Sequence, residues 1–124
     1  QNGGNIMEVV ISSSEHDILN SGSVITYSNT AELSFSIKMD DTFSFQLVLK
    51  FESTEEKQHE LKKNVSENTI ILTCVNFDNS LGTGTTRPIE LATFNGKKVS
   101  VNFWVYALGD KSLRKIVYSF YSER

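Results

Sequence analysis

The clearest pattern in the chain is an alternation of hydrophobic and polar residues with a period of two. Residues 43–51 carry a large apolar residue at every second position, and residues 33–39 repeat the pattern. Successive side chains of a strand point to opposite faces of a sheet, so each run predicts a strand with one face in a core. Asp40-Asp41-Thr42 is a polar turn between them. Together the two runs predict a β-hairpin.

Further β-rich runs fill most of the remaining chain. They cover residues 6–12, 23–27, 69–77, 89–94, 98–108 and 113–122. Turn residues bound the first two of these runs at 12–14, 20–22 and 28–30. Asn95-Gly96 is a strong hairpin signal because both residue types tolerate a positive φ, and Gly109 to Ser112 predicts a second turn. We therefore expect an all-β fold of roughly eight to ten short strands, an antiparallel β-sandwich with a small barrel as the alternative.

Residues 53–66 leave two interpretations open. Ser53 and Glu56 have the spacing of a helical capping box. Only two residues of the segment are apolar, however, so a helix there would have almost nothing to bury. We favour a polar edge strand over residues 57–65, with a short helix as the alternative.

Length and charge limit the classes of function. With 124 residues the chain has room for one domain, which we place at residues 6–124. Gln1 to Asn5 has the composition of an expression remnant or a disordered start, and Met7 is a plausible natural start. The formal net charge of −3 argues against nucleic acid as a partner, because binding to phosphates depends on clustered Lys and Arg.

The only cysteine, Cys74, lies within an apolar run, so we expect a buried, unreactive thiol and no intrachain disulfide. No run approaches the roughly 18 apolar residues that a membrane-spanning helix needs. We therefore expect a cytoplasmic protein without a membrane partner.

Residues suited to catalysis are scarce. Neither histidine, His16 or His59, has the spacing of a metal or catalytic site, and no nucleophile elbow occurs. Glu15 and Asp17 flank His16, but neighbouring residues of a strand point apart, so a solvated turn is expected there. We expect no enzyme, no metal and no cofactor.

A glycine- and threonine-rich loop is the most distinctive stretch of the chain. It runs through Gly82, Thr83, Gly84, Thr85, Thr86 and Arg87. Closely spaced glycines allow the backbone to turn its amides inward, and hydroxyls with a guanidinium can complete an anion-binding nest. The other interpretation is a tight crossover between two sheets that needs glycine for its geometry. We name these six residues as the candidate ligand-binding residues.

The last two strands have apolar residues on both faces. On the face opposite the expected core lie Trp104, Tyr106, Val117 and Tyr121. Tryptophan and tyrosine are favoured at interfaces because they combine a large apolar area with a polar group. We name these four residues as a candidate interface for a second copy of the chain or for another protein.

Several of these segments together resemble the signature of a known family. They are Asn76-Phe77, Leu81 to Glu90, Phe94 to Lys98 and Phe103 to Tyr106. The segments are similar to those of an uncharacterised bacterial family of small β proteins that carry a domain of unknown function. The resemblance implies a bacterial source and a stand-alone domain, and it implies no activity.

Two functions of different classes follow from these features. The first is a non-enzymatic protein-interaction or assembly module that forms a homo-oligomer or docks a partner through the outer face of the final hairpin. The alternative is a β-sandwich that binds a small ligand, an anion or a carbohydrate through the Gly82–Arg87 loop.

Overall fold

In the computed structural model, the described residues form ten β-strands and no helix. The described residues are 6–10, 17–26, 32–40, 43–56, 58–77, 82–94, 96–110 and 113–122. The strands are β1 (Ile6–Val10), β2 (Asp17–Thr26), β3 (Glu32–Asp40), β4 (Phe43–Glu52), β5 (Glu60–Ser66), β6 (Thr69–Val75), β7 (Thr83–Gly84), β8 (Ile89–Phe94), β9 (Lys97–Ala107) and β10 (Arg114–Ser122). Within these ranges there is accordingly no helix that could cross a membrane.

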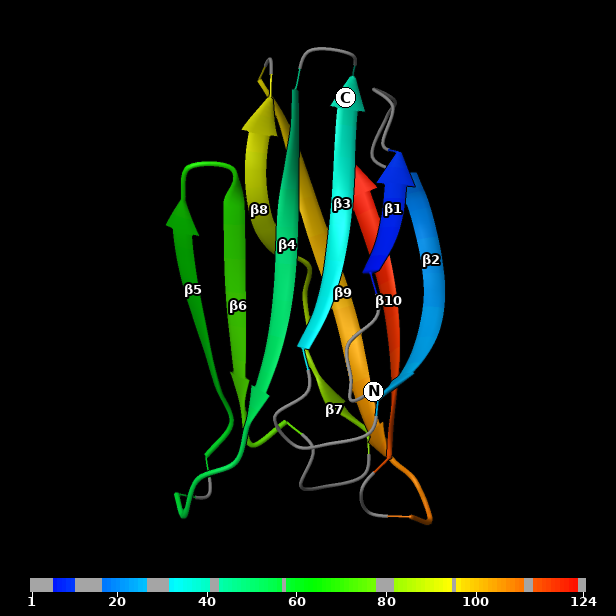
Figure 1. Cartoon of the computed structure of the whole chain (residues 1–124), viewed down its shortest axis with the longest axis vertical. Helices are drawn as coiled ribbons and strands as arrows, with labels where there is room; N and C mark the ends of the chain where they lie inside the picture. The colour runs from blue at the N-terminus through cyan, green and yellow to red at the C-terminus, as the bar shows by residue number, and fades with distance from the viewer. Residues whose placement is uncertain are drawn as a thin grey trace.

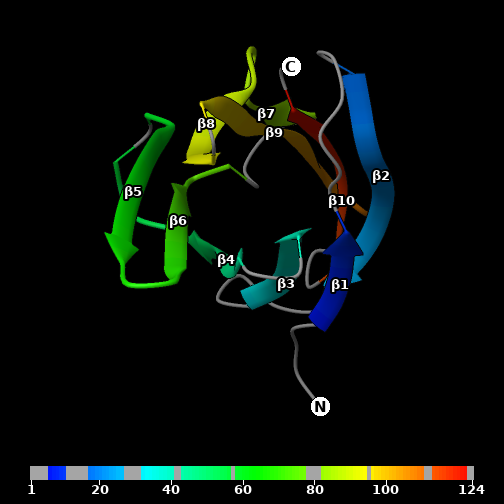
Figure 2. The same cartoon turned by 90° about the horizontal axis from the view of Figure 1, so that it is seen from above.

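The strands form two sheets that face each other (Figures 1 and 2). Sheet A has the order β1-β3-β4-β6-β5. Sheet B has the order β2-β10-β9-β7, and β8 also pairs with β9. The two sheets do not close into a barrel, so the predicted all-β sandwich is confirmed and the barrel alternative is wrong.

The core lies between the sheets and follows the period-two pattern. On β10 every inward residue is buried and every outward residue is at least partly exposed. Phe35 of sheet A meets Tyr118 and Phe120 of sheet B edge-to-face, with ring centroids 4.9 and 5.7 Å apart. Each such buried side chain contributes about 1.5–3 kcal/mol through the hydrophobic effect. Contacts of this kind hold the two sheets together.

Sheet A differs from the expectation of antiparallel pairing. The strand pairs β1–β3 and β4–β6 are parallel. β5 and β6 form a hairpin, and β6 returns between β4 and β5 (Figure 1). β6 therefore runs in the same direction as β4. Sequence periodicity does not predict the order or direction of strands in a sheet, because it reports only which face of a strand is buried.

The predicted turn at residues 20–22 is wrong. These residues lie within β2, which pairs with β10 along its length. Gly22 is opposite Tyr118, whose ring occupies the space above it, since a Cβ at position 22 would lie 2.6 Å from the Tyr118 Oη. The glycine is therefore required by packing in a strand rather than by a turn.

In the ambiguous segment, residues 60–66 form the edge strand β5 and the described residues before it are irregular. Fully buried Asn76, with a left-handed φ of 63°, holds this loop. Its Oδ1 accepts a hydrogen bond from the Thr54 N–H at 2.9 Å, and its Nδ2 donates to the main-chain oxygens of Glu56 and Gln58. The backbone groups that a helix needs are thus used by a residue about twenty positions away, which a local sequence window does not include.

Candidate interaction surface

The outer face of sheet B is ordered into cross-strand rows by the register of its strands. β10 lies between β2 and β9, so one outward residue from each strand meets in each row. Two neighbouring rows are Ile25–Lys115–Tyr106 and Ser23–Val117–Trp104. The next row along the sheet is Ser21–Ser119–Asn102, in which the hydroxyls of Ser21 and Ser119 lie 3.0 Å apart.

Exposed apolar side chains gather in the first two rows. Among the described residues, the exposed large hydrophobic residues are Ile25 at 50%, Val65 at 57% and Tyr106 at 40% exposure. Ile25 and Tyr106 flank Lys115 in one row, and half-buried Trp104 and Val117 occupy the adjacent row. We call Ile25, Trp104, Tyr106 and Val117 the aromatic patch. Contiguous exposed apolar patches larger than a few hundred Å² mark contact sites.

The structure brings together three of the four predicted interface residues. Trp104 is directly opposite Val117, and Tyr106 is one row away. Tyr121 is opposite Ser100 instead. It lies four residues along β10 from Val117, which is about 13 Å, and Ser119 projects between them on the same face. Tyr121 is therefore outside the aromatic patch.

Ile25 is a member of the patch that sequence reasoning missed. Its strand was expected, but the pairing of β2 with β10 links residues about ninety positions apart in the chain. Only that pairing brings Ile25 into the row of Tyr106. Nothing in the local pattern around Ile25 signals it.

The glycine- and threonine-rich loop lies against the same aromatic side chains. Thr83 and Gly84 form β7, which pairs with Val105 and Trp104 of β9. The indole of Trp104 leans over Gly84, where a Cβ would lie 2.9 Å from its Cδ2. A Cβ on Gly82 would lie 3.3 Å from Cε1 of Tyr106. The two features that the sequence singled out separately thus form one site.

The two glycines are needed for different reasons. Gly82 has a φ of 66°, in the left-handed region that favours glycine. Gly84 has no positive φ, but a Cβ there would overlap the main-chain oxygen of Phe103 and the Cα of Trp104. Close approach of two backbones, and not turn geometry, excludes a side chain at position 84.

Thr85 fastens the loop to β9. Its N–H donates to the Phe103 oxygen at 2.9 Å, and its Oγ1 accepts from the Phe103 N–H at 3.1 Å. Asn102 Nδ2 donates to both the main-chain oxygen and the Oγ1 of Thr85 at 2.9 Å. The hydroxyl of Thr83 donates to the main-chain oxygen of Phe77. We call the contacts of Thr85 with Asn102 and Phe103 the threonine latch.

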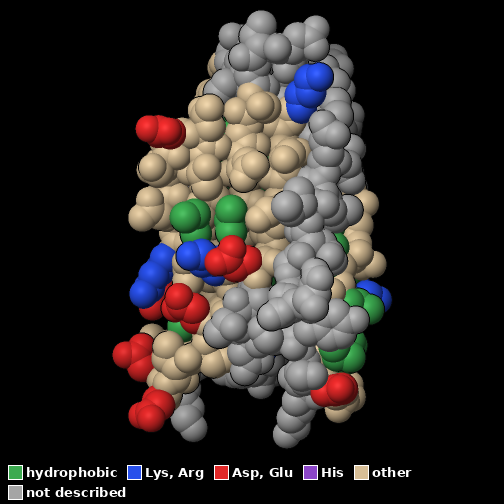
Figure 3. Space-filling view, viewed as in Figure 1, with side chains coloured by type: hydrophobic (Ala, Val, Ile, Leu, Met, Phe, Trp, Pro, Cys, Tyr) green, Lys and Arg blue, Asp and Glu red, His purple; other side chains and the backbone are tan. Residues whose placement is uncertain are grey.

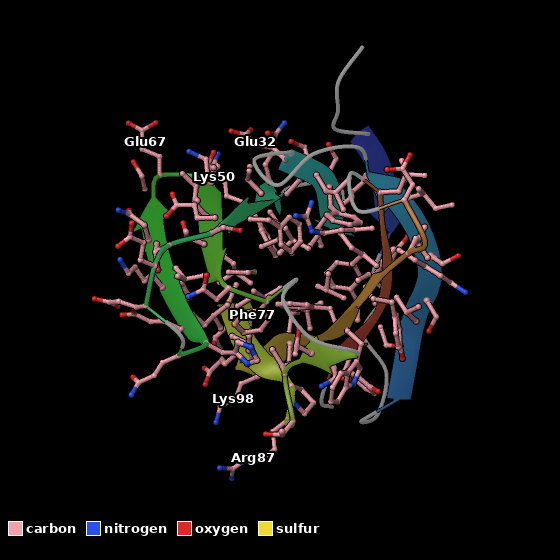
Figure 4. All side chains as sticks on the ribbon, turned by 90° about the horizontal axis from the view of Figure 1, so that it is seen from below. Glu32, Lys50, Glu67, Phe77, Arg87 and Lys98 are labelled. Atoms are coloured by element: carbon pink, nitrogen blue, oxygen red, sulfur yellow. The ribbon has the colours of Figure 1, made fainter. Side chains whose placement is uncertain are left out.

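These bonds narrow the candidate ligand-binding set. The hydroxyls of Thr83 and Thr85 are bonded within the chain, whereas Thr86 and Arg87 are exposed. The Arg87 side chain projects away from the sandwich (Figure 4). Binding of an anion by this loop stays a prediction, and it would depend mainly on Thr86 and Arg87. The crossover interpretation explains why the loop contains Gly82, Thr83, Gly84 and Thr85, since all four are used in its conformation or its hydrogen bonds.

Cys74 and His59 are the described cysteine and histidine of the chain. Cys74 is fully buried, and burial raises the pKa of its thiol well above the ordinary value. The ring of His59 packs against Phe77 with centroids 5.5 Å apart, while His16 lies outside the described residues. Within the described ranges no three His, Cys, Asp or Glu residues come together as a metal site.

A family model described as "Domain of unknown function (DUF6864)" matches residues 10–123. No curated protein and no solved structure matches the chain.

Proposed function

The chain belongs to this family of domains of unknown function, and we propose that it is a non-enzymatic assembly module of a bacterial cytoplasmic protein. In this proposal the outer face of sheet B packs against the same face of a second copy, with the aromatic patch in the contact.

The observation that carries the proposal is the position of Ile25 and Tyr106. They lie in one cross-strand row, next to the row of Trp104 and Val117. A fully buried aromatic side chain covers about 150–250 Å². Tyr106 is 40% exposed, so face-to-face packing of two patches would remove from water the part that the chain itself leaves uncovered. Two sheets pack naturally in this way at about 10 Å.

The charge on the two outer faces also supports this choice of surface. Sheet A carries an ion pair on the outer face of its two central hairpin strands, where Lys50 Nζ of β4 and Glu32 Oε2 of β3 are 3.8 Å apart (Figure 4). The described surface on that side is mainly polar, with hydrophobic side chains in small groups (Figure 3). On β9 and β10 the described charged residues of the outer face are Lys98 and Lys115, and Lys115 lies between Ile25 and Tyr106 at the end of the patch. Protein interfaces are depleted of charge at their centre and enriched in aromatic residues.

Light scattering at several concentrations tests the proposal with a matched pair of variants. Tyr106→Lys places a charge in the aromatic patch, whereas Val65→Lys places the same charge at another exposed apolar residue, on β5. We expect Tyr106→Lys to have fewer chains per particle than the wild type and Val65→Lys to equal the wild type. A single-chain wild type at high concentration, or equal masses for all three proteins, would refute the proposal.

Binding of a small ligand, an anion or a carbohydrate is the alternative function. It is supported by exposed Thr86 and Arg87, which follow the glycine that packs against the ring of Trp104. Titration with inorganic phosphate and with simple sugars tests it. This function would be favoured over assembly if the wild type is a single chain, binds one of these ligands saturably, and loses at least tenfold in affinity in Arg87→Ala.

A further inference from the structure

Two charged side chains of opposite sign lie on the outer face of sheet B, one toward each end of β9. Lys115 of β10 is exposed and lies opposite Tyr106. Glu90 of β8 is exposed and lies opposite Ser100. Ser100 and Tyr106 are an even number of residues apart on β9, so both charges project from the same face as the aromatic patch.

The midpoint between Lys115 and Glu90 falls on β9, beside Trp104. β10 and β8 lie on opposite sides of β9, about 5 Å from it, and the two charged residues are about 20 Å apart along the strands. This separation is too long for an ion pair within one chain. Within the described part of the chain, neither side chain forms an ion pair.

A twofold contact between two copies of this face can pair these charges. In such a contact, if one residue meets a second residue of the other copy, the second also meets the first. A twofold axis in the plane of the contact, through the midpoint beside Trp104 and perpendicular to the line that joins the charges, brings Lys115 of each copy over Glu90 of the other. The two Trp104 side chains then meet beside the axis, at the centre of the contact.

We propose that the face contact is held in one orientation by two reciprocal ion pairs, each between Lys115 of one copy and Glu90 of the other, around a centre formed by Trp104. This inference rests on the proposed function and specifies the orientation of that contact. The occupant is a second copy because one face supplies both charges at matching distances from its centre. Exposed ion pairs add little affinity, but they select an orientation because placing like charges together is unfavourable.

Charge reversal tests this orientation, with the dissociation constant measured by light scattering over a series of concentrations. Lys115→Glu or Glu90→Lys alone places like charges together at both ends of the contact and should raise the dissociation constant about tenfold or more. The double variant restores opposite charges and should return to within about threefold of the wild type. Lys98→Glu is the matched control, because exposed Lys98 lies on the same face opposite Thr93 and outside the proposed pairs. It should not weaken the contact.

The possible outcomes separate this pairing from the proposed function. If Tyr106→Lys loses mass but either single charge reversal keeps the wild-type dissociation constant, the face contact stands and the pairing is wrong. The pairing is also wrong if the double variant associates no more tightly than the single variants, or if Lys98→Glu weakens association as much as Lys115→Glu does. A single-chain wild type at high concentration refutes the proposed function and, with it, the pairing.

Discussion

At the scale of the residue, the alternation of apolar and polar positions predicted which side chains are buried. Phe103 and Val105 are fully buried, while Trp104 and Tyr106 lie on the opposite face, as the period of two requires. The position of a single glycine was harder to interpret. Gly22 was assigned to a turn, because the sequence does not show that the ring of Tyr118 lies above it.

Gly84→Ala should destabilise the protein, because the new Cβ would overlap the backbone of β9. Overpacking of this kind costs about 1–3 kcal/mol. Gly109→Ala is the control, since nothing lies within 4 Å of a Cβ there, and it should change stability by less than about 0.5 kcal/mol. Urea unfolding measures both. Equal stability of the two variants would show that β7 does not approach β9 as closely as the structure has it.

Cys74 should make stability depend on pH in alkaline solution. Burial raises the pKa of its thiol above the ordinary 9.0 in the folded state only, so the unfolded chain loses this proton first. The contribution of this group to the free energy of unfolding is therefore fully present below about pH 9. Above that pH the free energy of unfolding falls, by up to about 1.4 kcal/mol per pH unit for one proton.

Urea unfolding of wild type and Cys74→Val at pH 8, 9 and 10 measures this effect. The variant should lack the decline between pH 9 and 10. The buried phenol of Tyr118, whose pKa is also raised by desolvation from an ordinary 10.0, contributes only at still higher pH. Identical pH dependence of the two proteins would contradict the account of Cys74.

At the scale of the element, local patterns predicted the strands but not their partners. The hairpins β3–β4 and β8–β9 follow from turn chemistry within a few residues. The loop before β5 does not, because its conformation depends on Asn76. β7 was missed for a similar reason, since two residues have no periodicity and are held by β9.

The threonine latch gives an element-scale prediction. Thr85→Val removes the hydroxyl that accepts from the Phe103 N–H, whereas Thr85→Ser keeps it. A buried hydrogen bond of this kind contributes about 1 kcal/mol, and an unsatisfied donor costs more. The Phe103 amide should therefore exchange with solvent several-fold faster in Thr85→Val than in the wild type, with Thr85→Ser between them. Equal exchange in Thr85→Val and wild type would mean that the latch does not hold the loop.

At the scale of the whole molecule, the sequence predicted a two-layer β fold but not the order of strands within each layer. The aromatic patch shows the consequence. Trp104, Tyr106 and Val117 could be chosen from alternation on two consecutive strands, and the same choice included Tyr121, which lies opposite Ser100 and away from the other three. Adding Ile25 and removing Tyr121 both required the register of sheet B, which is set by contacts between distant parts of the chain.

The most direct test of the face contact is the fluorescence of Trp104, the only tryptophan of the chain. Face packing removes its exposed side from water. The account predicts that the emission maximum of the wild type shifts to longer wavelength on dilution. The shift should occur over the same concentrations at which light scattering shows the face-packed particle separating into smaller ones. An emission maximum that stays constant while the mass falls to that of one chain would contradict it.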